Sequence, residues 1–423
     1  MLVTYYDAYC VLTKVYSDGA YIKQALNDTV IEEKNRNQTT KICYGVLDKD
    51  VTLSYIIKKL CDKSPKLAIR TILKIALYSL KYLGTAPHAV CNTAVELIKK
   101  LGKGGTSGFV NAVLRKYIRD GVILPNDNSV LALSINYSYP EFAVKRLIND
   151  YGIELAKQIM SADKEHTFIR FNKGENGEDY LTLLNKNYQK TQFNSVFLVE
   201  NFKMDEGFYE GKYTFQSVGS VAICNLVIDG DNVSNLSSKN LLDTCSAPGG
   251  KAVYLAEYFN SVTACDVHEH RVSLINSYAS RMNKNNVTAM LLDATEYNSE
   301  FSEKFDYVLC DSPCSGYGVI KDNPDIKLNR SEESIKELSS LQLKILNNAS
   351  KYVKKGGYLC YSTCSIFREE NDEVIKKFLQ NNSEFECEIT KSPLPNLTFD
   401  YGNAFLPHLS LGAGFYFAKL KRV

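Results

Sequence analysis

Hydrophobic residues in the first part of the chain recur at spacings of three and four positions. They follow one another in this way between Ile56 and Leu60, and again between Ile69 and Leu80. This spacing puts them on one face of an amphipathic helix. The same pattern holds over residues 5–120. The sequence therefore predicts an all-α helical bundle, which we assign to residues 1–125.

The pattern changes after this bundle. Residues 120–129 combine Gly, Pro, Asn and Asp without any periodicity, which predicts a linker. Ser138 and Pro140 precede a helical pattern, so we expect Ser138 to cap the start of that helix. Residues 167–172 have the composition of a strand, and polar turns separate the short strand-like runs that follow. We expect linker helices and a small α+β module over residues 126–235.

Strands and helices alternate in the last part of the chain. Short apolar runs, rich in β-branched and aromatic residues, are each followed by a helical pattern. This alternation is typical of a parallel, doubly wound α/β sheet. We assign that sheet to residues 236–423, with strands expected at residues 241–243, 262–266, 288–292, 305–310, 358–362 and 414–420.

Length and composition agree with several globular domains. A chain of 423 residues is too long for one ordinary core, and its 45% hydrophobic and 23% charged residues are those of a folded protein. The first residues lack the basic and apolar segments of a signal peptide, and no window is apolar over about 18 residues. We therefore expect a cytoplasmic protein without a membrane partner, in which the 12 cysteines are reduced thiols.

Charge is distributed unevenly along the chain. Residues 1–125 contain 19 lysines and arginines against 10 aspartates and glutamates, although the whole chain has a formal charge of only +2. A basic domain is suited to the phosphate backbone of a nucleic acid. An ordinary solvated helical surface is the alternative.

Two expected strands deliver a thiol at their C-terminal ends. The strand that begins at Phe305 stops at Asp311, and Cys314 follows in the loop; a second strand leads to Cys364. Ligands of open α/β sheets bind at this edge of the sheet. If the two strands are neighbours, both loops face one cleft. Cys310 and Cys314, and likewise Cys360 and Cys364, have a Cys-x3-Cys spacing, which is a reason to consider zinc. Cys310 and Cys360 fall inside apolar strands, however, so we expect core thiols there and no metal site.

A glycine-containing loop between the first expected strand and its helix is a candidate ligand site. Glycines let the backbone approach a ligand, and free helix N–H groups can hold its polar end. The spacing matches neither the dinucleotide fingerprint nor a Walker loop. Acidic residues end the next strands, where carboxylates reach ribose hydroxyls. The candidate binding residues are Cys245, Ser246, Ala247, Pro248, Gly249, Gly250, Lys251, Asp266, Asp293 and Asp311.

These motifs resemble those of the RNA 5-methylcytosine methyltransferases, which have a Rossmann-like fold and use S-adenosylmethionine. The resemblance covers residues 165–423 and rests on four motifs, at residues 246–251, 311–318, 323–327 and 361–365, with Glu370-Asn371 behind the last. Ser246 replaces the usual alanine, and residues 216–220 lack a common acidic residue. Residues 87–90, 92–96 and 108–115 resemble a NusB-like RNA-binding domain. Together the two parts resemble bacterial 16S ribosomal RNA (cytosine-967-C5)-methyltransferases.

The resemblance implies a covalent mechanism. A thiolate that adds to carbon 6 of cytosine makes carbon 5 nucleophilic enough to accept a methyl group. Cys364 occupies the position of the attacking thiol, Asp311 would hold the ring, and Cys314 would assist release of the product. Spacing alone does not order the two thiols, because in DNA cytosine methyltransferases the Pro-Cys thiol attacks.

The expected partner is 16S ribosomal RNA before the subunit is fully assembled. The target base must leave its stack to reach a cleft at the strand ends. The resemblance implies that Arg170, Asn172 and Lys327 contact RNA, although Arg170 is equally explained as an exposed salt-bridge residue. We expect a monomer. The alternatives are the same reaction on transfer RNA and an RNA-binding assembly factor without catalytic activity.

Overall fold

The computed structural model describes residues 1–163, 166–230 and 232–423. The chain divides into two compact units. Unit 1 comprises Met1–Ser161 together with Ile320–Ser331, and unit 2 comprises Ala162–Val319 and Glu332–Val423. No helix of the described residues is long and apolar enough to span a membrane.

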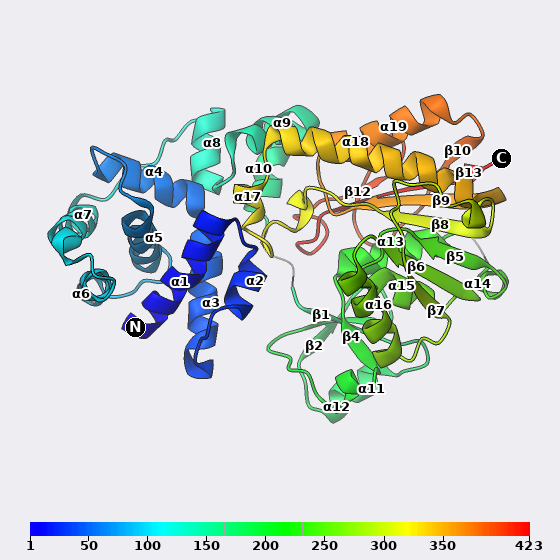
Figure 1. The fold of residues 1–423 in the computed structure, drawn as a ribbon, viewed down its shortest axis with the longest axis horizontal. Coiled ribbons are helices and arrows are strands. Elements are labelled where there is room, and N and C mark those ends of the chain that lie inside the picture. Colours follow the sequence, from blue (N-terminus) through cyan, green and yellow to red (C-terminus); the bar gives the residue numbers. More distant parts are fainter. Residues whose placement is uncertain (164–165, 231) are drawn as a thin grey trace. The chain divides into compact units, whose positions relative to one another are not determined.

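Unit 1 is all-helical, as the three- and four-residue spacing predicts (Figure 1). One hydrophobic core joins the helices of residues 1–120, and α5 contributes buried residues on most of its faces. The elements are α1 (Leu2–Asp18), α2 (Ile22–Asn27), α3 (Glu33–Asp48), α4 (Asp50–Leu60), α5 (Leu67–Lys81), α6 (Pro87–Lys100), η1 (Gly104–Thr106), α7 (Ser107–Asp120), α8 (Val130–Tyr137), α9 (Glu141–Tyr151), α10 (Ile153–Ser161) and the inserted α17 (Ile326–Asn329).

Ser138 does not have the predicted capping role. It ends α8 in a left-handed conformation with φ of 58°, and its Oγ accepts hydrogen bonds from the N–H groups of Val51 and Thr52 at the start of α4. Helix α9 follows Pro140 without a side-chain cap. The prediction was wrong because the hydroxyl satisfies free N–H groups of a helix distant in sequence.

The first part of unit 2 is a small α+β module. Its four-stranded sheet has the order β2-β3-β1-β4, and all of its pairs are antiparallel. Aromatic rings fill its core, with Phe171 packed edge-on against Phe197 at 5.8 Å between ring centroids. The elements are β1 (Phe168–Phe171), α11 (Gly177–Leu183), β2 (Tyr188–Lys190), β3 (Val196–Val199), α12 (Glu206–Tyr209) and β4 (Tyr213–Phe215).

The rest of unit 2 is built on a nine-stranded sheet, counted over the described residues. Its path is β11-β12-β13-β9-β8-β5-β6-β7, and β10 pairs with β13. The pairs between β7, β6, β5, β8 and β9 are parallel, whereas β13 is antiparallel to β9. The strands are β5 (Asn240–Asp243), β6 (Ser261–Asp266), β7 (Val287–Leu291), β8 (Phe305–Asp311), β9 (Val353–Thr363), β10 (Phe385–Glu388), β11 (Leu397–Thr398), β12 (Asn403–Phe405) and β13 (Phe415–Arg422).

Helices cover both faces of this sheet (Figure 1). Alternate residues of a strand point to opposite faces, so Leu241 and Leu309 share a core with α13 and α15, while Leu242 and Val308 share one with α18 and α19. The helices are α13 (Val218–Ile228), α14 (Val233–Leu236), α15 (Gly250–Leu255), α16 (Glu269–Arg281), α18 (Glu332–Ala349) and α19 (Asp372–Asn381), with 3-10 turns η2 (Ser299–Phe301), η3 (Tyr317–Val319), η4 (Ser350–Tyr352) and η5 (Arg368–Glu370).

The order of the strands locates the ligand edge. From β5 the chain proceeds outward through β6 to β7, then returns to the other side of β5 to form β8 and β9. Such a reversal opens a crevice at the carboxyl ends of the two strands beside it. Asp243 at the end of β5 is in register with Leu309, and Asp311 at the end of β8 with Ser362 of β9.

Candidate active site

The two predicted thiols meet at this edge of the sheet. Cys314 lies in the loop after β8 and Cys364 directly after β9, and their Sγ atoms are 2.9 Å apart. The N–H of Cys364 also donates to Cys314 Sγ over 3.2 Å. Because β8 and β9 are parallel neighbours, their loops emerge side by side. The expected proximity of the two thiols is therefore confirmed.

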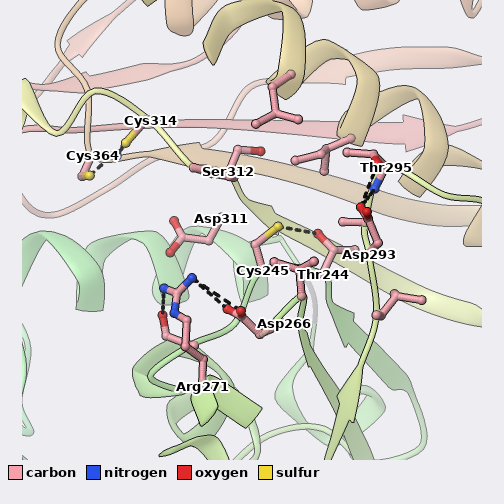
Figure 2. Close-up of a pocket in the computed structure, with 17 residues that line it drawn as sticks. Thr244, Cys245, Asp266, Arg271, Asp293, Thr295, Asp311, Ser312, Cys314 and Cys364 are labelled. Carbon is pink, nitrogen blue, oxygen red and sulfur yellow. Dashed lines mark hydrogen bonds and ion pairs between the residues drawn. The ribbon is translucent and has the colours of Figure 1, made fainter. Parts of the chain in front are cut away.

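Both thiols open into a cavity of about 520 Å³ (Figure 2). The cavity extends from Cys314 and Cys364 past Asp311 to Asp266 and Asp293, so it joins the ends of β6, β7, β8 and β9. Its apolar wall includes side chains of α18. The full lining is Thr244, Cys245, Ala247, Asp266, Val267, Arg271, Leu292, Asp293, Ala294, Thr295, Asp311, Ser312, Pro313, Cys314, Leu341, Ile345 and Cys364.

Asp311 is held by two neighbours. Its Oδ2 accepts a hydrogen bond from Lys251 Nζ over 2.6 Å, and its Oδ1 accepts one from Ser362 Oγ over 2.7 Å. Burial lowers the pKa of Lys251, but the charge of Asp311 and this hydrogen bond outweigh burial and raise it. Lys251 therefore stays protonated and fixes the carboxylate at the cavity wall.

Cys314 is held in its protonated form. The hydrogen bond with Cys364, followed by burial, raises the pKa of Cys314 well above its ordinary value. Cys314 therefore keeps its proton and can donate it toward the neighbouring sulfur. Cys245 also lines the cavity, but burial raises the pKa of its thiol strongly.

Asp266 and Asp293 form the opposite end of the cavity. Asp266 is buried at the end of β6, where it accepts from the N–H of His268 and pairs with Arg271 over 3.2 Å. Asp293 accepts hydrogen bonds from the hydroxyl and the N–H of Thr295. These bonds, and chiefly the one from the hydroxyl, lower the pKa of Asp293. Two fixed carboxylates thus face the cavity as acceptors for hydroxyl or amino groups.

The loop after β5 takes the course that its glycines allow. Gly249 has φ of 105°, a conformation that residues with a side chain rarely adopt, and begins helix α15. Thr244, Cys245 and Ala247 reach the cavity, whereas Ser246 is buried in the loop and Pro248 is exposed. Of the predicted binding residues, Ser246, Pro248, Gly249, Gly250 and Lys251 shape or support the site and do not line it.

The end of the cavity that Asp266 and Asp293 form fits a nucleoside-containing cofactor. It combines the acceptors of Asp266 and Asp293 with the buried hydroxyl of Ser312, which lacks a hydrogen-bond partner among the described residues. Burial, with the nearby charge of Asp311, raises the pKa of Asp243 to about 7. Asp243 does not line the cavity.

Arg170 and Asn172 lie away from the cavity, inside unit 2. Arg170 is fully buried; its Nε donates to Gln216 over 2.7 Å and its Nη1 pairs with Glu257 over 2.8 Å. Asn172 donates to the carbonyl of Gly211 over 2.6 Å. The salt bridge of the alternative interpretation is present, but the expected exposure of Arg170 was wrong, because the ion pair is buried where the small module packs against the nine-stranded domain.

Lys327 is likewise enclosed, within unit 1. Its Nζ donates to the backbone oxygen and to Oδ1 of Asp48 over 2.8 and 2.9 Å, and it lies 4.8 Å from the centre of the Tyr139 ring. Burial lowers the pKa of Lys327 to about 8. Contact with RNA would require this lysine to leave Asp48, so the prediction of direct contact gains no support from the geometry.

Other contributors were not predicted. Ser362 holds Asp311, Arg271 pairs with Asp266 and lines the cavity, and the buried carboxylate of Glu370 accepts hydrogen bonds from the loops of both thiols. A signal existed for Glu370, which belongs to the matched motif at residues 370–371. Arg271 lies in the first turn of α16, after the strand that Asp266 ends, but an arginine in that position is too common to stand out.

Comparison with known proteins identifies the family. Residues 234–421 match the family model described as 16S rRNA methyltransferase RsmB/F, and residues 8–119 match the NusB family. The chain is 31% identical over 454 residues to the probable ribosomal RNA small subunit methyltransferase B of Bacillus subtilis, a match that covers 97% of each chain. It is 30% identical over 413 residues to ribosomal RNA small subunit methyltransferase B of Proteus mirabilis, covering 93% of this chain and 92% of the relative.

The fold is shared with a solved structure. A methyltransferase homologue from Pyrococcus horikoshii superimposes with a TM-score of 0.59 at 26% identity, covering 70% of this chain and 100% of that one. The expected fold class, a NusB-like helical domain followed by a Rossmann-like methyltransferase domain, is confirmed. The chain therefore belongs to the RsmB/F family of S-adenosylmethionine-dependent ribosomal RNA methyltransferases.

Proposed function

We propose that this enzyme methylates carbon 5 of one cytosine in 16S ribosomal RNA through a transient bond between Cys364 and carbon 6 of the base. The target that the family resemblance suggests is position 967. The observation that carries the proposal is the pair of thiols, with Sγ atoms 2.9 Å apart, in a cavity that also contains Asp311.

Cys364 is assigned as the nucleophile. When bound, S-adenosylmethionine supplies an electrophilic methyl group, which carbon 5 of an unmodified cytosine is too weak a nucleophile to accept. The Cys364 thiolate adds its electron pair to carbon 6, and the electrons of the ring double bond become available at carbon 5. Asp311, fixed by Lys251 and Ser362, would bind the base at N3 and the exocyclic amine and favour the electron-rich adduct.

Cys314 is assigned to release of the product. After methylation, Cys314 gives its proton to the leaving sulfur of Cys364 and takes up the carbon-5 proton in its place, while the carbon–sulfur bond breaks with its electrons returning to Cys364. The raised pKa of Cys314, due first to its hydrogen bond with Cys364, keeps it a thiol beside the leaving sulfur. The hydrogen bonds of Cys314 to both the Sγ and the N–H of Cys364 support this placement.

Trapping of the covalent intermediate tests the assignment. Each thiol is replaced by alanine, and the purified variants are incubated with S-adenosylmethionine and a 16S ribosomal RNA fragment. We expect C314A to accumulate a protein–RNA adduct that resists denaturant, because release is blocked. We expect C364A to form none, because no bond to carbon 6 is made. Electrophoresis under denaturing conditions measures both.

The opposite pattern would reverse the two roles, and absence of an adduct in every variant would reject covalent catalysis. Bisulfite mapping of ribosomal and transfer RNA, from cells with and without the enzyme, identifies the nucleotide. A site in transfer RNA would overturn the proposed substrate. We further propose that the enzyme acts as a cytoplasmic monomer, on RNA that is not yet fully assembled into the subunit.

A further inference from the structure

A buried carboxylate lies behind the two thiols. Glu370 ends the turn η5 and is fully buried. Its Oε1 accepts hydrogen bonds from the Ser315 N–H over 2.7 Å and from Gln342 Nε2 over 3.1 Å. Its Oε2 accepts from the hydroxyls of Ser315 and Ser365, each over 2.5 Å. A buried carboxylate is costly unless donors surround it, and this one has four.

The donors of Glu370 come from both thiol loops. Ser315 follows Cys314 directly, and Ser365 follows Cys364 directly. One side chain therefore ties the loop after β8 to the loop after β9 at the residues adjoining the two sulfurs. The loops are also linked directly, by the two hydrogen bonds between Cys314 and Cys364, by the hydroxyls of Ser315 and Ser365 at 3.2 Å, and by the Gly318 N–H, which donates to the carbonyl of Cys364.

The next residue and α18 secure the same arrangement. Gln342 of α18 donates to the carbonyl of Pro313 over 2.9 Å as well as to Glu370. Asn371 accepts from the hydroxyl of Thr363 over 2.6 Å and donates to the carbonyl of Ser365 over 3.0 Å. Gln342 and Asn371 thus hold Glu370 and its neighbours in place, and the hydrogen bonds of Glu370 restrict the movement of both thiol loops.

We propose that Glu370 is a positioning residue for the methyl transfer, which holds the loop of Cys314 against the loop of Cys364 so that both thiols act on the same base. This inference rests on the proposed roles of the thiols. Glu370 itself does not line the cavity, so it does not touch the base. Displacement of a reacting group by about 1 Å can cost about a hundredfold in rate.

Three substitutions of Glu370 distinguish the effect of its side-chain length from the effect of its charge. E370Q keeps the length of the side chain, and the hydroxyls of Ser315 and Ser365 can rotate to accept from its amide. E370D keeps the charge but is one methylene shorter, so it cannot reach both loops. E370A loses every hydrogen bond. A positioning role predicts that E370Q resembles the native enzyme more closely than E370D and E370A do, whereas a proton-transfer role predicts that E370Q is inactive.

The distance between the thiols is measured directly by disulfide exchange with oxidised glutathione. One cysteine displaces a glutathione thiolate to form a mixed disulfide, and the second cysteine displaces the other glutathione, so two thiols are oxidised and one glutathione disulfide is reduced. The equilibrium yield, quantified by mass spectrometry of the 314–364 peptide pair, gives their effective concentration. We expect a fall of about tenfold to a hundredfold in E370A and E370D, but about threefold or less in E370Q.

Adduct formation gives a second readout that loss of folding would not mimic. In E370A, Cys364 still attacks but Cys314 is displaced, so the denaturant-resistant adduct should accumulate as in C314A. An unfolded variant would form none. Binding of S-adenosylmethionine and circular dichroism should stay native, because Asp266 and Asp293 are untouched. The matched control is E373A, which removes an exposed glutamate of α19 that pairs only loosely with Lys376 over 3.9 Å.

Two results would overturn the inference. One is a thiol effective concentration that is unchanged in E370A. The other is a loss of activity in E370Q equal to that in E370A while E370D stays active, which would indicate a requirement for charge. If C314A and C364A both behave like the native enzyme, the proposed function fails instead, and the exchange measurement still reports whether Glu370 sets the distance between the thiols.

Discussion

At the scale of residues, the environment of each cysteine separates chemistry from packing. Cys310 and Cys360 lie one residue or a few before the strand ends, inside the sheet, and burial raises the pKa of each to about 12. Neither lines the cavity, so these two thiols belong to the packing of the sheet. Cys314 and Cys364 lie just beyond the same strands, where the chain leaves the core and enters the cavity. Two cysteines that lie a few positions apart, one inside a strand and one just after it, thus have different roles.

Asp243 makes a pH-dependent contribution to stability. Its pKa is about 7 in the folded protein, mainly because burial disfavours the charge, against an ordinary value of 3.8. Between these two pH values the folded state holds a proton that the unfolded state has released. Its contribution is therefore fully present below about pH 4 and is lost as the pH rises through about 7.

Substitution of Asp243 by asparagine isolates this effect, since asparagine resembles the protonated acid and does not titrate. We expect D243N to match the native enzyme near pH 4 and to have the higher unfolding temperature near pH 8. Scanning calorimetry at the two pH values measures the difference. A difference that does not change with pH would show that Asp243 does not titrate in this range.

At the scale of elements, local pattern was sufficient for the strands that carry the site. The expected strands at residues 262–266 and 305–310 differ by one residue from β6 and β8. Apolar composition and a following turn are local properties, and parallel strands meet at one edge by geometry. The burial and ion pairing of Arg170 and Lys327 could not be predicted from local pattern. Their partners, Glu257 and Asp48, are 87 and 279 residues distant in the sequence.

The turn after β8 depends on a glycine. Gly318 packs so tightly that an added Cβ would lie 2.1 Å from the carbonyl oxygen of Gly414 and 2.8 Å from that of Cys364. Backbone atoms cannot yield as a flexible side chain can. We expect G318A to displace the loop of Cys364, to cost about 1–3 kcal/mol in the free energy of unfolding, and to reduce methyl transfer about tenfold or more.

Chemical denaturation and methylation of the RNA fragment measure these two effects. The control is G108A, in α7 of unit 1, where an added Cβ meets nothing within 4 Å. Alanine in a helix is more stable than glycine by about 0.5–1 kcal/mol, so this variant should be at least as stable as the native enzyme and equally active. Equal activity of G318A and G108A would show that the turn tolerates displacement.

At the scale of the whole molecule, the chain passes from one unit to the other more often than a succession of separate domains along the sequence would require. Residues 320–331 lie between two strands of the methyltransferase sheet, yet they belong to unit 1. There Lys327 binds Asp48, and the carboxylate of Asp325 faces the N–H of Ile22 at 3.4 Å. Removal of residues 1–125 would leave this segment without its partners. Tests of RNA binding therefore require substitutions in the full chain.

Unit 1 contains a basic cavity suited to phosphate groups. Its volume is about 590 Å³, and three cations, Lys58, Arg70 and Lys74, line it together with two acids, Asp50 and Asp62. Lys74 is neutralised by Asp50. For the head groups of Lys58 and Arg70 no acidic partner is found in the described part of the chain. The cavity therefore keeps a net positive charge, and its position in a region with an excess of lysine and arginine favours contact with an RNA backbone.

Salt dependence tests this contact in the intact enzyme. Each phosphate contact adds roughly 0.7 to 0.9 to the slope of log affinity against log salt concentration, so the double variant K58Q/R70Q should have a slope smaller by roughly one to two. Fluorescence anisotropy with the 16S fragment at several salt concentrations measures it. Lys34 and Lys157 already pair with Glu32 and Glu154, so K34Q/K157Q should leave the slope unchanged. If both double variants change the slope equally, RNA responds to the net charge of unit 1, and the basic cavity has no special role.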